Sequence, residues 1–176
     1  IAEASTDPAG LFARDDLTAL VITTQHESHA GLVARALRAG KSVFVEKPLA
    51  LNAAQLEEVE AAYRESRALP NPPLLMIGFN RRFSPLVVKM KQLLAAVAEP
   101  KCLVMTVNAG AIPPDHWTQD PEKGGGRIIG EGCHFVDLLR HLVGAPITAT
   151  HAVCVGRDSG VPTPEDKVML TLSFAD

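Results

Sequence analysis

Residues 19–48 read ALVITTQHESHAGLVARALRAGKSVFVEKP, and two kinds of hydrophobic pattern alternate along this stretch. Ala19–Thr23 is a short apolar run of the kind that forms a buried strand. Apolar residues at helical spacing follow, with Ser28 at the expected N-cap and Gly40 at the expected C′ position. Ser42–Val45 is a second apolar run. The stretch therefore predicts a strand, a helix and a second strand.

The same alternation continues downstream. Asn52 followed three residues later by Gln55 resembles a capping box and predicts a helix that runs through Ala68. Leu74–Ile77 then predicts a third strand. Strands that alternate with helices indicate a parallel sheet covered by helices, so the predicted fold class of this half is α/β.

The second half of the chain follows a different pattern, beyond a boundary that we place near Gly78–Asn80. We expect a helix over Ser84–Val97 and a long strand over Lys101–Val107. A loop rich in Pro, Asp and Gly spans Ala111–Gly126, and a strongly amphipathic helix follows and ends at Gly144.

Two more strands are predicted over Ala149–Val155 and Val168–Phe174, joined by the turn-rich stretch Gly156–Pro164. Strands grouped around helices indicate an α+β unit with an open antiparallel or mixed sheet. The last run alternates and needs a partner strand, since an open edge exposes unpaired N–H and C=O groups. Because the sequence also begins at Ile1 rather than Met, we expect it to be an excerpt of a longer protein.

Composition excludes several classes of protein. The 176 residues are 47% hydrophobic and 21% charged, which is typical of a soluble globular domain. Seventeen basic and twenty acidic residues give a net charge of −3 without a basic cluster, and aromatic residues make up only 5%, so we expect no nucleic-acid partner. Three scattered cysteines do not suit a disulfide framework or a zinc ribbon, which favours the cytoplasm. No apolar run approaches the roughly 18 residues of a membrane helix, so we expect no membrane partner.

Polar residues follow each strand of the predicted parallel sheet. These strand ends are Thr23-Thr24-Gln25-His26, Glu46-Lys47-Pro48 and Gly78-Phe79-Asn80-Arg81-Arg82. Ligands of open α/β sheets bind outside the carboxyl ends of the strands, so we expect a site at this edge. Loops are commonly polar for solvation alone. For any one of these loops, a ligand site and ordinary solvation explain the polar residues about equally well.

Lys47 is the first candidate for chemistry. Pro48 restricts the residue before it to extended conformations, which holds the lysine stiffly at a strand end. A fixed ammonium can donate a hydrogen bond to a substrate hydroxyl and favour the developing alkoxide. The alternative is a surface lysine paired with Glu46.

His134 is the second candidate. It lies in the amphipathic helix between Glu131 and Asp137, each three residues away and on the same face. An imidazole accepts protons near neutral pH, and neighbouring carboxylates can orient it. A core histidine bonded to a carbonyl is the alternative. We expect no metal, because Glu131 with His134 lacks a second Glu-x-x-His, and the pair His26 and His29 spans a predicted helix start.

The glycines 124–126 lead into this helix. They do not match a dinucleotide fingerprint, since the spacing to Gly130 is one residue off and a loop precedes them where a strand is needed. They do allow a ligand to approach the backbone closely. Trp117, the only tryptophan, either covers a sugar ring or caps an edge of the core.

Taken in order, these motifs resemble the glucose-fructose oxidoreductase/inositol dehydrogenase family (Gfo/Idh/MocA). The motifs that carry the resemblance are Thr23-Thr24, His29, Glu46-Lys47-Pro48-Leu49, Gly78-Phe79-Asn80-Arg81-Arg82-Phe83, Trp117, Gly124-Gly125-Gly126 and Gly132-Cys133-His134-Phe135-Val136-Asp137. The resemblance runs across nearly the whole chain.

The resemblance implies that residues 1–79 are part of an NAD(P)-binding Rossmann domain. Residues 80–176 would then be part of an α/β domain that binds substrate and forms a dimer. Members transfer hydride between NAD or NADP and a carbon of a small sugar, cyclitol or sugar nucleotide. Their open sheets pair across subunits, which implies a homo-oligomer.

The resemblance also implies roles for individual residues. Lys47 and His134 would be catalytic, as the substrate-facing lysine and the acid/base. The remaining site residues would line the cofactor or the substrate, without a metal. The implied cofactor residues are Thr23, Thr24, His29, Glu46 and Lys47, and the implied substrate residues are Asn80, Arg81, Trp117 and Asp137.

The sequence departs from the family pattern in two places. The Gly-x-Gly-x-x-Gly phosphate turn is missing, so we expect these residues alone to bind cofactor weakly or not at all and to be inactive. Gly130 stands where many members have an Asp four positions before the histidine. Whether the neighbouring Glu131 replaces the missing carboxylate is open. A non-catalytic relative that senses metabolites or recruits a partner is therefore the alternative function, and an interaction module using its sheet face is a third.

Overall fold

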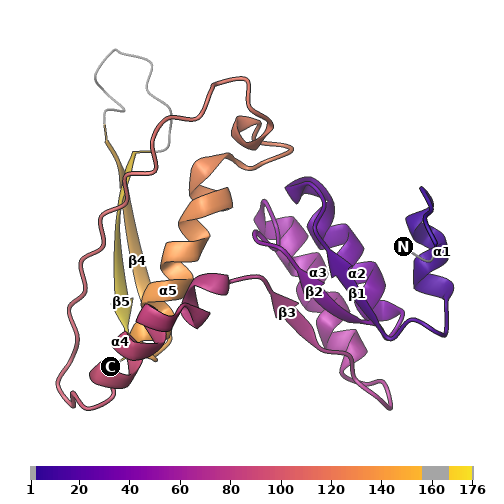
Figure 1. Cartoon of the computed structure of the whole chain (residues 1–176), viewed down its shortest axis with the longest axis horizontal. Helices are drawn as coiled ribbons and strands as arrows, with labels where there is room; N and C mark the ends of the chain where they lie inside the picture. Colours follow the sequence, from indigo (N-terminus) through magenta and orange to yellow (C-terminus); the bar gives the residue numbers. More distant parts are fainter. Residues whose placement is uncertain (1–2, 156–166, 176) are drawn as a thin grey trace. The chain divides into compact units, whose positions relative to one another are not determined.

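The computed structural model of the chain describes residues 3–155 and 167–175 (Figure 1). The chain divides into two compact units. The first unit comprises Ile1–Gly78 and Glu122–Gly124, and the second comprises Phe79–Pro121 and Gly125–Asp176. Among the described residues, no helix has the length and the apolar character needed to cross a membrane.

A three-stranded parallel sheet forms the centre of the first unit. Its strands are β1 (Ala19–Ile22), β2 (Ser42–Val45) and β3 (Leu75–Ile77), in the order β1-β2-β3. Val21 pairs with Phe44, and Phe44 pairs with Met76. The three predicted strands and the α/β class are confirmed.

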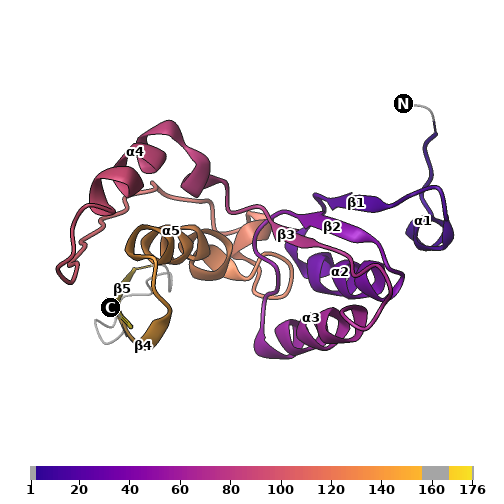
Figure 2. The ribbon, with the colours of Figure 1, turned by 90° about the horizontal axis from the view of Figure 1, so that it is seen from below.

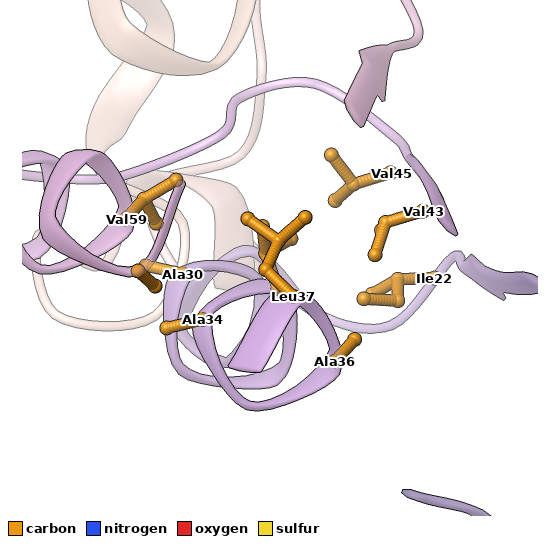
Figure 3. Close-up of a cluster of buried hydrophobic side chains, with 10 residues drawn as sticks. Ile22, Ala30, Ala34, Ala36, Leu37, Val43, Val45 and Val59 are labelled. Carbon is orange, nitrogen blue, oxygen red and sulfur yellow. The ribbon is translucent and has the colours of Figure 1, made fainter. Parts of the chain in front are cut away.

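Two helices connect these strands, α2 (His29–Arg38) and α3 (Ala53–Ser66), and a short helix α1 (Pro8–Ala13) precedes β1. Figure 2 shows that α2 and α3 cover the same face of the sheet. Figure 3 shows Leu37 of α2 pointing toward the valines of β2 and toward α3. The buried hydrophobic core of this unit consists of Ile22, Ala30, Val33, Ala34, Ala36, Leu37, Val43, Val45, Val59 and Ala62.

The ends of these helices follow the sequence pattern with two differences. Gly40 has a φ of 71° after α2, as its predicted C′ position requires. Asn52 accepts a hydrogen bond from the Gln55 amide at 2.9 Å, but the Gln55 side chain reaches back to the amide of Leu51. Ser28 stands before α2 without capping it, because it already belongs to a 3₁₀ turn, η1 (His26–Ser28).

The second unit is a mixed helix and sheet structure. Its strands β4 (Ile147–Cys154) and β5 (Val168–Phe174) pair in antiparallel fashion, as predicted. The predicted connection Gly156–Pro164 lies outside the described residues. The helical elements of this unit are η2 (Asn80–Phe83), α4 (Pro85–Leu94), η3 (Trp117–Gln119), a π-helical turn η4 (Ile128–Gly132) and α5 (Cys133–Val143). Gly144, with a φ of 86°, ends α5 at the predicted residue.

The predicted strand Lys101–Val107 is wrong, because this segment has no regular secondary structure. Its apolar run Cys102–Met105 satisfies only one requirement of a strand. The other is a neighbouring backbone that accepts and donates hydrogen bonds, and in the described part of this unit the sheet consists of β4 and β5 alone. The preceding helix also ends earlier than predicted, at Leu94.

Candidate functional site

The carboxyl ends of β1, β2 and β3 bring the first group of predicted site residues to one edge of the sheet. Thr23 and Thr24 follow β1 and are exposed, whereas Glu46 and Lys47 follow β2 and are half-buried. Gly78 follows β3 and is buried. Since the three strands are parallel neighbours, their ends lie at the same edge, where open α/β sheets bind ligands.

Backbone hydrogen bonds extend the sheet one residue beyond its strands. The Glu46 amide donates to the Ile22 carbonyl at 2.9 Å, and the Gly78 amide donates to the Val45 carbonyl at 2.8 Å. These bonds fix the backbone from which the Glu46 side chain projects. The Lys47–Pro48 peptide bond that follows is cis.

The Glu46 carboxylate lies directly against Gly78. A Cβ added to Gly78 would be 3.1 Å from each carboxylate oxygen, which is tighter than nine in ten real Cβ contacts. Glycine therefore leaves the space that the carboxylate occupies. The sequence pattern placed both residues at this edge, but it did not predict their contact.

His29 connects two of the strand ends. Its ring is fully buried, with Nδ1 2.7 Å from the Pro48 carbonyl and Nε2 2.9 Å from the Thr24 carbonyl. Because both ring nitrogens are engaged by backbone oxygens, any contribution of His29 to a cofactor site would act through the loops that carry Thr24 and Pro48.

The segment 122–124 also packs on the first unit, although it lies far along the sequence from the other residues of that unit. His26 Nδ1 lies 2.9 Å from the Gly124 carbonyl, across 98 residues of chain. The Glu27 amide donates to the Lys123 carbonyl at 3.1 Å. Since a carbonyl oxygen only accepts, His26 donates through Nδ1. Residues Lys123 and Gly124 are thus attached to the turn that follows β1.

The glycine segment has the backbone conformations that its composition suggests. Gly125 and Gly126 have φ angles of 77° and 73°, which are strained for residues with a side chain. The π-helical turn η4 follows and contains the buried Gly130. The sequence predicted an ordinary α-helix from Ile128, whereas π turns are rare and often occur at functional sites.

In the second unit, α5 carries His134 and Asp137 in buried positions. The His134 ring meets Phe79 edge to face, with ring centroids 6.2 Å apart. The Asp137 carboxylate accepts hydrogen bonds from Arg82, one of them from Nε at 3.1 Å and the other from Nη2. Both Asp137 oxygens are therefore engaged by Arg82, and contact of Asp137 with substrate stays a prediction.

The other predicted substrate residues lie on η2 and η3. Asn80 and Arg81 are exposed on η2, and the Arg81 guanidinium stacks over the Phe135 ring at 4.7 Å. Trp117 is half-buried on η3, with its ring 5.9 Å from that of His116. Their substrate contacts also stay predictions. In the described ranges, 3–155 and 167–175, no three His, Cys, Asp or Glu side chains gather as metal ligands.

The charged environment of Asp137 extends to His141, one helical turn further along α5. Burial lowers the pKa of His141 below its ordinary value of about 6.5, and the positive charges of Arg82 and Lys91 lower it further. The Asp137 carboxylate opposes this effect. The folded protein therefore binds the His141 proton less readily than the unfolded chain does.

We expect the free energy of unfolding to fall as the pH drops below about 6.5, because protonation of His141 then favours the unfolded chain. The contribution is at most about 1.4 kcal/mol per pH unit. Urea unfolding between pH 8 and pH 5 measures it, and His141→Gln should flatten the dependence. An equally steep dependence in that variant would show that another group is responsible.

The parallel sheet, its covering helices and the polar strand ends define part of a Rossmann-type domain, followed by an α+β unit. The family described as "Oxidoreductase family, NAD-binding Rossmann fold" matches residues 2–69. The "GFO/IDH/MocA C-terminal domain" matches residues 87–176, which is more than half of the chain. The chain belongs to the Gfo/Idh/MocA family.

Similar curated proteins and solved structures agree with this assignment. Inositol 2-dehydrogenase 2 of Saccharopolyspora erythraea is 34% identical over 170 residues, covering 93% of this chain and 46% of the relative. The scyllo-inositol 2-dehydrogenase (NAD(+)) of Bacillus subtilis is 32% identical over 148 residues, covering 82% of this chain and 41% of the relative. The chain spans about half the length of the curated relatives that it matches.

Two solved structures show the same fold over nearly the whole chain. Levoglucosan dehydrogenase, in complex with NADH and levoglucosan, superposes with a TM-score of 0.76 at 25% identity, covering 97% of this chain and 48% of that one. A probable dehydrogenase from Thermotoga maritima superposes with a TM-score of 0.74 at 27% identity, covering 97% and 50%.

Proposed function

We propose that this chain contributes to an oxidoreductase that transfers hydride between NAD(H) and a CH–OH carbon of a cyclitol or sugar. The observation that carries the proposal is the match of both units, in order, to the two domains of one oxidoreductase family. The relatives named as inositol dehydrogenases and the levoglucosan dehydrogenase structure support this substrate class.

The residues at the edge of the parallel sheet suit the ribose and nicotinamide part of a dinucleotide. Thr23 and Thr24 expose side-chain hydroxyls, and Glu46 holds its carboxylate in the space left by Gly78. These groups can accept and donate hydrogen bonds to ribose hydroxyls. The bound nicotinamide would supply the hydride acceptor.

The protein's own residues would handle the proton. Oxidation of an alcohol requires the hydroxyl proton to leave as the hydride departs, and an imidazole is suited to accept it at neutral pH. We assign this role to His134, and we assign to the Lys47 ammonium the hydrogen bond that favours the alkoxide. Asn80, Arg81 and Trp117 would contact the substrate. The proposal requires Lys47 and His134 to meet at one substrate in the assembled protein.

The sequence lacks a Gly-x-Gly-x-x-Gly turn, which holds the pyrophosphate in dinucleotide sites. We therefore expect the 176 residues alone to bind NAD(H) weakly and the complete protein that carries them to bind it well. NADP is the alternative cofactor. We also propose a cytoplasmic homo-oligomer that forms through the β4–β5 sheet, where Met169 and Leu170 are exposed.

The test of the function is cofactor reduction by the complete protein. NAD or NADP is offered with myo-inositol, scyllo-inositol, levoglucosan and glucose, and reduced cofactor is followed by its absorbance. We expect reduction with at least one of these polyols. A protein that binds neither dinucleotide would overturn the proposal.

A metabolite sensor is the second candidate, and Gly130 is the observation that favours it. Its lack of a side chain removes the carboxylate that many members place four residues before the histidine. Binding of NAD without turnover on any substrate of the panel would support the sensor over the dehydrogenase.

The substitution Gly78→Ala tests the role of Glu46. The added methyl group shifts the Glu46 carboxylate by a few tenths of an ångström, and since that carboxylate ends a flexible side chain, stability should change by less than about 1 kcal/mol. The dissociation constant for NAD should rise by up to about 3-fold, as for a hydrogen bond of weakened geometry. Titration calorimetry on the complete protein measures it.

Gly31→Ala is the matched control for this substitution. A Cβ at Gly31, on α2, meets nothing within 4 Å, so cofactor affinity should stay unchanged. Equal affinities of the Gly78→Ala variant and the unaltered protein for NAD would show that Glu46 does not contact the cofactor.

A further inference from the structure

His29 holds together two loops that the sequence separates by a helix and a strand. The ring stands at the first position of α2, with no exposed surface. Nδ1 lies 2.7 Å from the carbonyl of Pro48, and Nε2 lies 2.9 Å from the carbonyl of Thr24. One side chain thus binds the backbone of the loop after β1 and the backbone of the loop after β2.

These are the loops that carry the proposed cofactor and catalytic groups. Thr24 belongs to the loop after β1, and Pro48 directly follows Lys47 in the loop after β2. The sheet fixes the distance between the two backbones only as far as the hydrogen bond from the Glu46 amide to the Ile22 carbonyl. Beyond that bond, the imidazole ring of His29 links the two backbones through the carbonyls of Thr24 and Pro48.

The partners of the ring make this cross-link depend on hydrogen-bond donors. Both partners are backbone carbonyls, which only accept, so each contact needs an N–H on the ring. A neutral imidazole carries one N–H, and an imidazolium carries two. An apolar side chain of similar volume would fill the same space but would satisfy neither carbonyl, and leaving buried carbonyls without donors is costly.

We propose that His29 is a positioning residue. It sets the distance between Thr24 and Lys47 and so orients the cofactor for hydride transfer, without touching the cofactor itself. This inference rests on the proposed function.

Two substitutions separate the two bonds. In His29→Asn the amide nitrogen can take the place of Nδ1 and keep the bond to Pro48, whereas in His29→Gln it can take the place of Nε2 and keep the bond to Thr24. For the complete protein, we expect each variant to raise the KM for NAD about 3- to 10-fold and to lower kcat, since one of the two contacts between the ring and a carbonyl is lost. His29→Leu loses both contacts and should raise the KM for NAD more than about 10-fold. The KM for the polyol substrate should stay within about twofold in all three variants.

Val33→Ala is the control for loss of stability alone. Val33 is fully buried on the same helix, one turn after His29, and its side chain has no polar atom that could bond either loop, so its truncation destabilises the unit through packing alone. We expect a lower melting temperature in this variant with an unchanged KM for NAD. A merely structural His29 would behave in the same way.

A measurement on the unaltered protein covers the case in which the His29 variants do not fold. The ring N–H protons of His29, observed by NMR with ¹⁵N-labelled histidine, should exchange with water at least about 10-fold more slowly when NAD is bound, because the cofactor holds both loops in place. Unchanged exchange would overturn the inference.

The outcomes distinguish this inference from the function on which it rests. If the unaltered protein binds no nicotinamide dinucleotide, the proposed function fails and the inference fails with it. If the unaltered protein binds and reduces NAD while folded His29 variants keep its KM for NAD and its kcat, the inference alone is overturned.

Discussion

Replacing His134 by Ala is expected to lower the turnover of the complete protein by roughly 100- to 10,000-fold, the range typical of a lost acid–base group. The side chain is 7% exposed on α5, one turn before Asp137. If this imidazole accepts the hydroxyl proton, the variant lacks the positioned base that takes the proton as hydride leaves. The steady-state rate of NAD reduction measures the loss.

Cofactor binding separates this loss of chemistry from a loss of folding. The His134→Ala variant should bind NAD with unchanged affinity, because the proposed cofactor residues lie in the first unit. His151→Ala, at an exposed position of β4, should keep full turnover. Unchanged turnover in the His134→Ala variant would show that His134 is not the group that accepts the proton.

Replacing Arg82 by Met is expected to lower the free energy of unfolding by about 3 kcal/mol, because the variant leaves the Asp137 carboxylate buried without its counter-charge. The Asp137 side chain is 8% exposed, and both of its oxygens accept hydrogen bonds from Arg82. Urea unfolding of this chain at neutral pH measures the change. The pair joins η2 to α5, so its loss should also weaken the packing around His134.

A double-mutant cycle isolates the contribution of the ion pair. Adding Asp137→Leu to Arg82→Met removes the buried charge, so the double variant should be more stable than the Arg82→Met single variant. The exposed Arg14 pairs with Glu3 and Asp16, and Arg14→Met should cost less than about 1 kcal/mol. If the two Arg→Met variants lose equal stability, the Arg82–Asp137 pair contributes no more than a surface pair.

Local patterns were sufficient to predict most of the elements. Hydrophobic runs of four or five residues predicted the strands of the parallel sheet, and Gly40 and Gly144 predicted the ends of α2 and α5. These signals act over one or two helical turns, so the sequence displays them directly. The segment Lys101–Val107 shows the limit of this reasoning, since an apolar run says nothing about whether a partner strand lies beside it.

The sequence by itself determined the fold class, the order of the elements and the types of residue at the strand ends, because each depends on neighbours along the chain. Tertiary structure alone decided that His29 bonds two loops, that Arg82 engages Asp137 across 55 residues, and that Gly124 accepts from His26 across 98. These contacts depend on directional hydrogen bonds between residues that only the folded backbone brings together, and no spacing in the sequence encodes their distances or their angles.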